Sequence, residues 1–248
     1  AITNCLNFGN PEKPKIMGQF VECVDGIKEA CKFLNFPVVS GNVSFYNETN
    51  SKSIFPTPVI GGIGVLNNLK KIMNIKTKRP GNLIMVIGKT FGHLNQSAFL
   101  QENFSICDGP PPEINLINEK NNGLAILELI KENFILSAHD ISSGGILLSL
   151  TEMSMASKLG LKIYKPEKLI NPLEYFFGED QGRYLVEIEK NNLNKINNFL
   201  KKNNIFGEVV AEVQNDTFEI EKTFSFNIQE FCNYNNQWYY KYNAIGKK

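Results

Sequence analysis

The sequence predicts a fold of mixed helical and sheet layers, and three observations support this prediction. Apolar residues recur at helical spacing in several segments, short apolar runs of strand length lie between them, and glycine- or proline-rich stretches separate the two kinds of segment. Because helices and strands alternate along the chain, a helical bundle and a β-sandwich are both disfavoured. A chain of 248 residues, 42% of them hydrophobic, can bury an ample core without disulfides.

The first part of the chain is expected to contain one long helix flanked by strands. Residues 1–8 look extended, and Pro14 suits the first turn of a helix. A short β-like run at 36–39 and a glycine-rich strand at 57–66 follow that helix. The helix itself is predicted by apolar residues at spacings of three and four: Met17, Phe20, Val21, Val24, Ile27, Cys31 and Leu34.

A polar and basic segment at 67–81 is interpreted as a junction between two domains, 1–75 and 76–248. Its lysines could contact phosphate or nucleic acid, but a solvated linker is the simpler interpretation. The elements expected beyond it are, in order, a strand at 83–87, a proline-rich loop at 108–119, a helix at 123–132, a strand at 134–138, a helix from 144 to about 159, strands at 161–164 and 184–188, a helix near 193–200, and strands near 205–213 and 217–221.

Composition argues against several classes of protein. The 26 basic and 25 acidic residues nearly cancel, so no global electrostatic reason exists to expect nucleic acid as a partner. No apolar run approaches the ~18 residues that a membrane helix needs, and we expect no membrane partner. The five cysteines form no C-x-x-C pair and fit a reducing, cytoplasmic location. With two histidines, a multi-histidine metal site is excluded.

The first candidate ligand site is a loop expected at 40–44, with the sequence Ser-Gly-Asn-Val-Ser. Gly41 would let the backbone approach a phosphate closely. The side-chain oxygen of Asn42 is a hard ligand suited to Mg²⁺, and Ser44 could donate to a phosphate or carbonyl oxygen. A plain turn is the alternative, because Ser, Gly and Asn are common turn formers.

A second candidate is the segment 3–11, in which three asparagines and a glycine precede the predicted helix. They could face an anion at the helix N-terminus, or bond their own backbone.

A third candidate follows the strand predicted at 134–138. Asp140 comes at its end and two glycines then open a helix, which is where α/β proteins bind ligands. Asp140 could hold a metal; the alternative is a helix start capped by Ser142 or Ser143. His139 could be a general base, although a lone histidine beside a strand end is more often a structural hydrogen-bonder.

The fourth candidate is the segment 177–183, with adjacent carboxylates and an amide. Glu179, Asp180 and Gln181 could bind metal or substrate, and the alternative is a solvated turn before the next strand. Arg183, one of only two arginines, could pair with Glu179 or Asp180.

Taken together, these motifs resemble phosphoribosylformylglycinamidine synthase of the small bacterial type. The matching segments are 3–14, 37–49, 56–61, 137–140 with the glycine pair at 144–145, and 177–181, in family order. The family contains two tandem copies of an A domain plus a B domain, in the aminoimidazole ribonucleotide synthetase superfamily. The resemblance therefore implies an α+β fold, with 1–75 as the last part of the second A domain and 76–248 as the whole second B domain. Because the sequence begins at Ala1 inside a motif, we expect it to be the C-terminal part of a longer protein.

The resemblance also implies an activity. ATP would phosphorylate the amide oxygen of formylglycinamide ribonucleotide, and ammonia would then displace phosphate from this iminophosphate to give the amidine, a step of de novo purine biosynthesis. The implied cofactors are ATP and Mg²⁺. The implied partners are a glutaminase subunit, a small bridging subunit and the N-terminal half of the same enzyme, without which this chain is expected to be inactive. The alternative is a non-catalytic module that binds nucleotide or docks the glutaminase.

Site residues are carried over by motif position. Asn4 and Gly41 resemble contacts to ATP, Asn42 a Mg²⁺ ligand, and Ser44 a substrate contact. Asn4 stands where many members have Asp. No residue is assigned as catalytic, because the family's catalytic groups lie in the first half, and His139 is not promoted to that role. Four residues look like counterparts of first-half ligands in a degenerate second site, with a structural role or lining a non-catalytic nucleotide pocket: Asp140, Glu179, Asp180 and Gln181.

One segment departs from the family pattern. Members tend to have Gly-Gly-Ser near the start of the B domain, where this chain has Leu-Asn-Gln-Ser at 94–97. This difference weakens the expectation of a phosphate-binding loop there.

Overall fold

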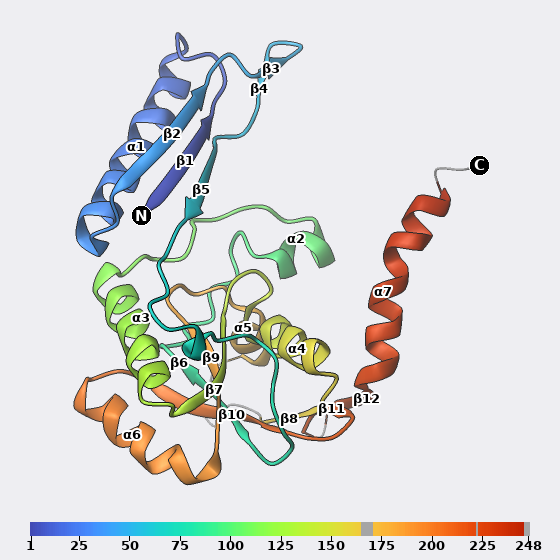
Figure 1. Cartoon of the computed structure of the whole chain (residues 1–248). Coiled ribbons are helices and arrows are strands. Elements are labelled where there is room, and N and C mark those ends of the chain that lie inside the picture. The colour runs from blue at the N-terminus through green and yellow to red at the C-terminus, as the bar shows by residue number, and fades with distance from the viewer. Residues whose placement is uncertain (165–170, 222, 246–248) are drawn as a thin grey trace. The chain divides into compact units, whose positions relative to one another are not determined.

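The computed structural model describes residues 1–164, 171–221 and 223–245, and the chain divides into two compact units, Ala1–Leu69 and Lys70–Lys248. Each unit is built around its own sheet (Figure 1). The assignment of the chain to a second A domain over 1–75 and a second B domain over 76–248 stays a prediction.

The first unit is a three-stranded sheet with one long helix packed on it (Figure 1). Its strands run in the order β2-β1-β5, with β1 parallel to β2 and antiparallel to β5. The core between sheet and helix is formed by Leu6, Phe8 and Ile16, with Phe20 edge-on to Phe8. The elements are β1 (Ile2–Asn7), α1 (Pro14–Leu34), β2 (Val38–Ser44), the short hairpin of β3 (Glu48–Thr49) and β4 (Lys52–Ser53), and β5 (Thr57–Gly62).

The long helix has the start and end that its sequence predicts. Pro14 lies in the first turn of α1, where its missing N–H costs nothing. Asn35 ends the helix in the left-handed conformation with φ +59°, and its N–H bonds the Cys31 carbonyl.

The expected loop at 40–44 is wrong: these residues are part of strand β2. They pair in parallel with β1, so that Gly41 lies beside Asn4 and Ser44 beside Asn7. Pairing with β1 satisfies the backbone groups on one side of this edge strand, and this long-range pairing outweighs the local turn tendency of Ser, Gly and Asn. The strand expected at 57–66 is shorter than predicted and ends at Gly62.

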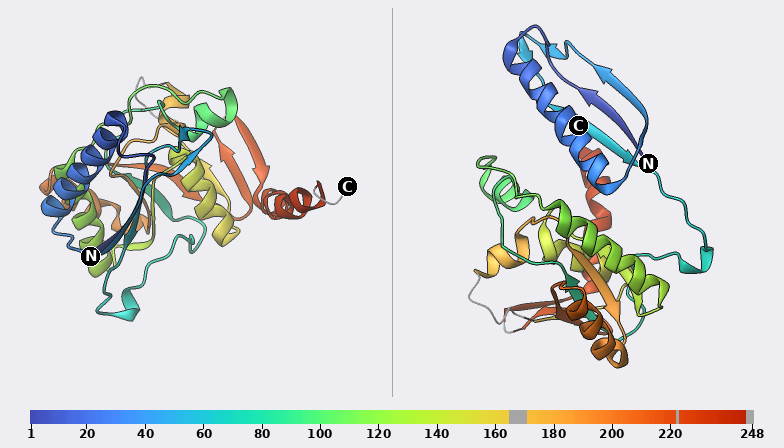
Figure 2. Two further views of the ribbon diagram at one scale, coloured as in Figure 1. Left: turned by 90° about the horizontal axis from the view of Figure 1, so that it is seen from above. Right: turned by 90° about the vertical axis from the view of Figure 1, so that its left-hand side faces the viewer.

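The second unit is a seven-stranded sheet between two layers of helices (Figure 2). The strand order is β12-β11-β8-β10-β6-β9-β7. Its elements are β6 (Leu83–Ile87), α2 (Ala98–Phe104), α3 (Leu116–Lys131), β7 (Ile135–Asp140), α4 (Gly145–Ser157), β8 (Leu161–Ile163), α5 (Pro172–Phe177), β9 (Tyr184–Ile188), α6 (Leu193–Lys202), β10 (Gly207–Val213), β11 (Thr217–Ile220), β12 (Phe224–Asn227) and α7 (Ile228–Ile245), with short 3₁₀ turns at Leu69–Lys71 and Lys190–Asn192.

Strand β6 lies inside this sheet and is buried on both faces. Leu83, Met85 and Ile87 point toward α3 and α6, while Ile84 and Val86 point toward α4, α5 and α7. This explains why its sequence is a continuous apolar run instead of an alternating one.

Several helices differ from the sequence prediction. Helix α3 begins at Leu116, inside the loop expected at 108–119, because the Asn115 side chain caps it and accepts from the Asn118 N–H at 3.0 Å. Helices α2, α5 and α7 were not predicted; the first two are short. Among the described residues, no helix combines the length and apolar character needed to cross a membrane.

Helix α7 is joined to the second unit mainly through its first turns. Ile228 and Cys232 belong to the core, whereas Trp238 is 58% exposed farther along the helix. Figure 2 shows the helix projecting away from the sheet of this unit.

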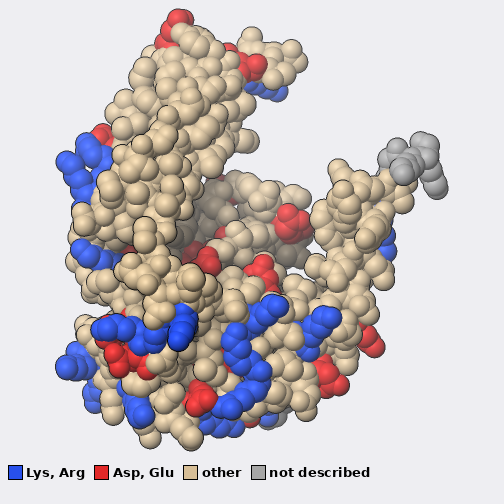
Figure 3. Space-filling view, viewed as in Figure 1, with Lys and Arg blue, Asp and Glu red and all other residues tan. Residues whose placement is uncertain are grey.

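Charged side chains of both signs lie close together on the second unit. Figure 3 shows Lys and Arg beside Asp and Glu on the face in view, whereas the first unit presents few charges on its face. Two such pairs are Lys190 with Glu212 and Arg79 with Glu189.

Glu187 is a fully buried carboxylate in the middle of β9. Both of its oxygens accept from the Lys78 N–H at 2.9 Å, and Asn82 Nδ2 and the Ser137 hydroxyl donate at 2.7 and 3.2 Å. The carboxylate thereby joins the segment that enters the second unit to strand β9 of its sheet.

We expect Glu187→Ala to destabilise the chain by about 3 kcal/mol, because it leaves buried donors unpaired. Urea unfolding followed by circular dichroism measures this. Glu189→Ala is the matched control; its carboxylate pairs with Arg79 on the surface and should cost less than about 1 kcal/mol. Equal losses for the two variants would contradict the anchoring role of Glu187.

Candidate functional site

The four residues carried over as ligand contacts lie on the adjacent strands β1 and β2, but on opposite faces of the sheet. Leu6 packs against α1, so Asn4, two positions away, also faces the helix. Residues paired across parallel strands point the same way, which puts Gly41 on the helix face with Asn4. Asn42, paired with Cys5, and Ser44, paired with Asn7, point to the opposite, open face.

Gly41 lies against the Asn4 side chain on the helix face of the sheet. Asn4 lines a small cavity of about 290 Å³ under α1, beside Ile27 and Cys31. A Cβ atom on Gly41 would lie 2.5 Å from Asn4 Oδ1, closer than real contacts allow. Glycine at 41 therefore leaves room for the Asn4 amide, which would have to shift if residue 41 carried a side chain.

Asn42 and Ser44 present polar groups on the open face of the sheet. Asn42 Nδ2 lies 3.8 Å from Cys5 Sγ, and within the described ranges its Oδ1 accepts no hydrogen bond. Ser44 Oγ lies 3.4 Å from Asn47 Oδ1, and the Asn47 amide donates to the Phe8 carbonyl at 3.0 Å. The face thus offers the Asn42 amide oxygen, which has no partner among the described residues, and the Ser44 hydroxyl, about 7 Å apart along the strand.

Glu48 holds the loop that precedes α1, a role that the sequence reasoning missed. Its Oε1 accepts from the Lys13 ammonium and the Ser53 hydroxyl, each at 2.7 Å, and from the Asn10 N–H at 3.2 Å. These hydrogen bonds, the one from Lys13 first, lower the pKa of Glu48 from 4.5 to about 2.

The second unit collects its polar groups at one edge of the sheet. Strand pairing places Ile87, at the end of β6, beside Tyr184 and Gly207, where β9 and β10 start. Asp140, at the end of β7, is also paired with Tyr184. The loop from α5 to β9, which carries the sequence motif 177–183, therefore crosses this edge.

Arg183 is the buried centre of that loop, with 1% of its surface exposed. Its guanidinium donates to the carbonyls of Gly178 and Asp180 at 2.6 and 3.1 Å and to the Thr90 hydroxyl at 3.1 Å. It also lies 3.7 Å from the Asp180 carboxylate, so the expected pairing with Asp180 is confirmed. Burial lowers the pKa of Arg183, and the Asp180 carboxylate opposes this shift.

The carboxylates of this loop bind backbone amides. Asp180 accepts from the N–H groups of Phe91, Gly92 and His93 at 2.8, 2.9 and 3.2 Å. Glu179 Oε1 accepts from the N–H groups of Ala98 and Gly144 at 2.8 and 2.7 Å. Asp180 is only 5% exposed, so the alternative of a solvated turn is wrong for this part of the loop.

The alternative of a serine cap on α4 is also wrong. The N-cap residue is Gly144, at φ +79°, which has no side chain that could cap the helix. The Gly144 N–H donates to the Glu179 carboxylate, so the acceptor at this helix start is Glu179 and not the hydroxyl of Ser142 or Ser143. Ser97, at the end of the segment 94–97, caps α2 and accepts from the Leu100 N–H at 3.3 Å.

His139 and Asp140 lie at the end of β7, and no group of metal-ligating side chains among the described residues surrounds them. His139 Nδ1 lies 3.2 Å from Asp140 Oδ1 and its Nε2 lies 2.9 Å from Glu152 Oε2, which agrees with the hydrogen-bonding interpretation. The Asp140 side chain is 72% exposed. Within the part of the chain that is described, no three His, Cys, Asp or Glu side chains group to hold a metal ion.

Gln181 and Glu119 border two cavities at this edge, of about 620 and 370 Å³. Asp140 and Glu179 also line the smaller one, and Asp180 the larger. Burial raises the pKa of Glu119, which sequence reasoning did not single out. The four residues of the expected degenerate site thus meet at one edge, although two of their carboxylates already bind backbone amides.

Two protein-family models match the chain. The family model for the N-terminal domain of AIR synthase related proteins matches residues 1–66, and the model for their C-terminal domain matches residues 79–222. The chain belongs to the AIR synthase related family, and the expected α+β fold is confirmed.

Among curated proteins, the chain is similar to phosphoribosylformylglycinamidine synthase subunit PurL. The Pelagibacter ubique protein is 47% identical over 242 residues, which cover 98% of this chain and 33% of that protein. The Bartonella bacilliformis protein is 41% identical over the same coverage of both. The chain spans about a third of the length of these relatives, and the resemblance stated from its motifs is confirmed.

Solved structures agree on the fold. PurLQS from Thermotoga maritima matches with a TM-score of 0.69 and 20% identity, covering 93% of this chain and 37% of that one. T. maritima PurL complexed with FGAR matches with a TM-score of 0.70 and 19% identity, covering 93% and 39%. Escherichia coli HypE, a hydrogenase maturation protein, matches with a TM-score of 0.62 and 15% identity, covering 91% and 72%.

The lowered pKa of Glu48 makes a prediction about pH. Because the folded state binds this proton less tightly than the unfolded state, the contribution of Glu48 to stability is complete above about pH 5 and is lost as pH falls toward 2. Glu48→Gln should therefore lower the melting temperature near neutral pH and converge with the unchanged chain in acid. Glu22→Gln, on the exposed side of α1, is the control; a constant gap between the Glu48→Gln and parent curves across pH would contradict the assignment.

Arg183→Met should destabilise the chain by about 3–5 kcal/mol, because it leaves the buried Asp180 carboxylate without its cation. The other arginine supplies the control, since Arg79 is mostly exposed and Arg79→Met should cost less than about 1 kcal/mol. Chemical unfolding of both variants tests the difference. A loss for Arg183→Met no larger than for Arg79→Met would show that the loop does not depend on it.

Proposed function

We propose that this chain is part of an ATP-dependent carbon–nitrogen ligase, phosphoribosylformylglycinamidine synthase. The observation that carries the proposal is the 47% identity to a PurL subunit over nearly the whole chain. The complete enzyme would convert formylglycinamide ribonucleotide and ammonia to the amidine in purine biosynthesis. Solved PurL structures with ATP and with FGAR, which share this fold, support nucleotide and substrate binding by such a protein.

In this proposal the chain contributes the open face of β1 and β2. An amide carbonyl is a poor electrophile, and ATP with Mg²⁺ would supply the phosphoryl group that turns its oxygen into a leaving group. Asn42 Oδ1, which has no partner within the described residues, would be one ligand of the cation. Ser44, positioned beside Asn47, would donate to the substrate. Asn4 and Gly41, the proposed contacts to ATP, face α1 on the other side of the strand pair, so they would not reach a cation held by Asn42.

The donor set fits a contribution to a metal site and not a complete one. Asn42 supplies a neutral oxygen, and the described part of the chain holds no cluster of three acidic, histidine or cysteine side chains. The remaining ligands and the catalytic groups would come from the two thirds of the relatives that this chain does not span. We therefore propose that the chain has no activity by itself.

The proposed partners follow from the same relatives. The T. maritima PurLQS structure supports assembly with further subunits, here proposed to be a glutaminase that delivers ammonia and a small bridging subunit. The proposed location is the cytoplasm.

The alternative of a non-catalytic module has one observation in its favour. The carboxylates of Glu179 and Asp180 in the second unit already accept backbone N–H groups, which suits a structural role. This favours a degenerate site at the sheet edge of the second unit, and leaves the proposal for β1 and β2 untouched.

Asn42→Ala and Ser44→Ala, made in a protein that also carries the remaining two thirds of a PurL relative, should each lower kcat/KM by about 100-fold, or about 2.7 kcal/mol. The measurement is ATP-dependent amidation with ammonia as nitrogen donor. Asn67→Ala, an exposed asparagine of the inter-unit segment, serves as control. Near-normal rates for both strand variants would favour the non-catalytic module.

The chain alone should show no ATP-dependent amidation above background. The assay is phosphate release that requires formylglycinamide ribonucleotide, with folding of the chain checked by circular dichroism. Sustained turnover by the chain alone would contradict the proposal that the other two thirds are needed.

A further inference from the structure

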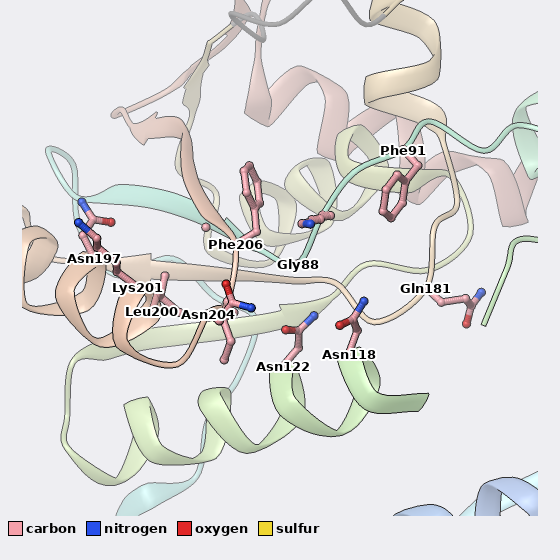
Figure 4. A pocket seen from close by; sticks show the side chains of 13 residues that line it. Gly88, Phe91, Asn118, Asn122, Gln181, Asn197, Leu200, Lys201, Asn204 and Phe206 are labelled. Atoms are coloured by element: carbon pink, nitrogen blue, oxygen red, sulfur yellow. The ribbon is translucent and has the colours of Figure 1, made fainter. Parts of the chain in front are cut away.

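A groove of about 480 Å³ opens between α3 and α6 of the second unit (Figure 4). Its lining includes the backbone at Gly88, just after β6, and at Gly207, where β10 starts. We call it the amide groove, because five side-chain amides line it: Asn118, Asn122, Gln181, Asn197 and Asn204. Side-chain amides both donate and accept hydrogen bonds, so a ligand with several hydroxyl groups suits this lining.

The charges along the amide groove are of one sign. Lys89 and Lys201 line it, and no Asp or Glu does. Neither lysine side chain has a hydrogen bond or ion pair within the described residues. In Figure 4 Lys201 lies beside Asn197 at one end of the groove, and Gln181 and Phe91 lie at the other. An anionic group on a ligand would therefore meet positive charge without a competing carboxylate.

Asn122 gives independent evidence of a ligand-facing group. It is only 7% exposed, and its Nδ2 donates to the Gly182 carbonyl at 2.8 Å, which fixes the orientation of the amide. Its Oδ1 accepts no hydrogen bond from any described residue, and Figure 4 shows the side chain pointing from α3 into the groove. A buried, oriented amide with a free acceptor is what recognition of a ligand hydroxyl requires.

We propose that the amide groove binds a small organic phosphate, a phosphate ester of a sugar or polyol. The phosphate lies at Lys201, at the end of the groove beside Asn197, and the hydroxyl groups bond the amides, Asn122 Oδ1 among them. Phe91, 72% exposed at the other end, offers an apolar surface for the rest of the ligand. The volume falls within the range of about 300–1,000 Å³ typical of small-molecule sites. This site shares no residue with the proposed contacts on β1 and β2.

Titration calorimetry of the chain with ribose 5-phosphate, ribose and inorganic phosphate tests the proposal. Ribose 5-phosphate should bind saturably, at least about tenfold more tightly than ribose or inorganic phosphate. Lys201→Met and Asn118→Asp should each weaken it by about fivefold to tenfold, by removing a positive charge or adding a negative one. Lys202→Met, the next position on α6 and outside the groove, is the matched control.

Asn42→Ala separates this inference from the proposed function. It should leave ribose 5-phosphate binding unchanged, even though it is expected to impair amidation in the longer protein. Absence of saturation at millimolar concentrations, equal weakening by Lys202→Met, or equal affinity for inorganic phosphate would each overturn the proposal. In the last case the amides would contribute nothing to recognition.

Discussion

The buried guanidinium of Arg183 is the constraint on which the polar edge of the second unit's sheet depends. It holds two carbonyls of its own loop and the Thr90 hydroxyl, and it compensates the Asp180 carboxylate. With that carboxylate fixed, three consecutive N–H groups at 91–93 have an acceptor, and the neighbouring Glu179 can reach the starts of α2 and α4. One cation thus organises segments that lie far apart in the chain, because a buried charge is tolerated only when its partners are in place.

The two units use polar residues in opposite ways. In the second unit, the carboxylates of Glu179 and Asp180 accept backbone N–H groups at the sheet edge. Gln181 and Glu119 are left to face its cavities. In the first unit, Asn42 and Ser44 lie on the sheet face opposite α1. Glu48 and Lys13 form an ion pair that fixes the loop before α1.

Local patterns predicted much of the fold but little of the site geometry. Helix α1 and strand β6 are recognisable because their apolar residues follow a helical period and a doubly buried run. Residues 40–44 were misread because their strand depends on pairing with β1, which local propensity does not encode. The motifs named Asn42 and Ser44, but only the register shows that they share a face opposite Asn4. The hydrogen bonds of Glu187 could not be predicted from the sequence, because Lys78 lies 109 positions before Glu187 in the chain.

The exposed aromatic end of α7 has a spectroscopic consequence. Trp238 is the only tryptophan of the chain, and it lies far along a helix whose anchoring residues, Ile228 and Cys232, are in its first turns. Its emission therefore reports on fraying or coverage of that helix end, with Tyr239 and Tyr242 as near neighbours at 5.8 and 6.2 Å between ring centroids. A protein that covered this end of α7 would remove Trp238 from water and shift its emission.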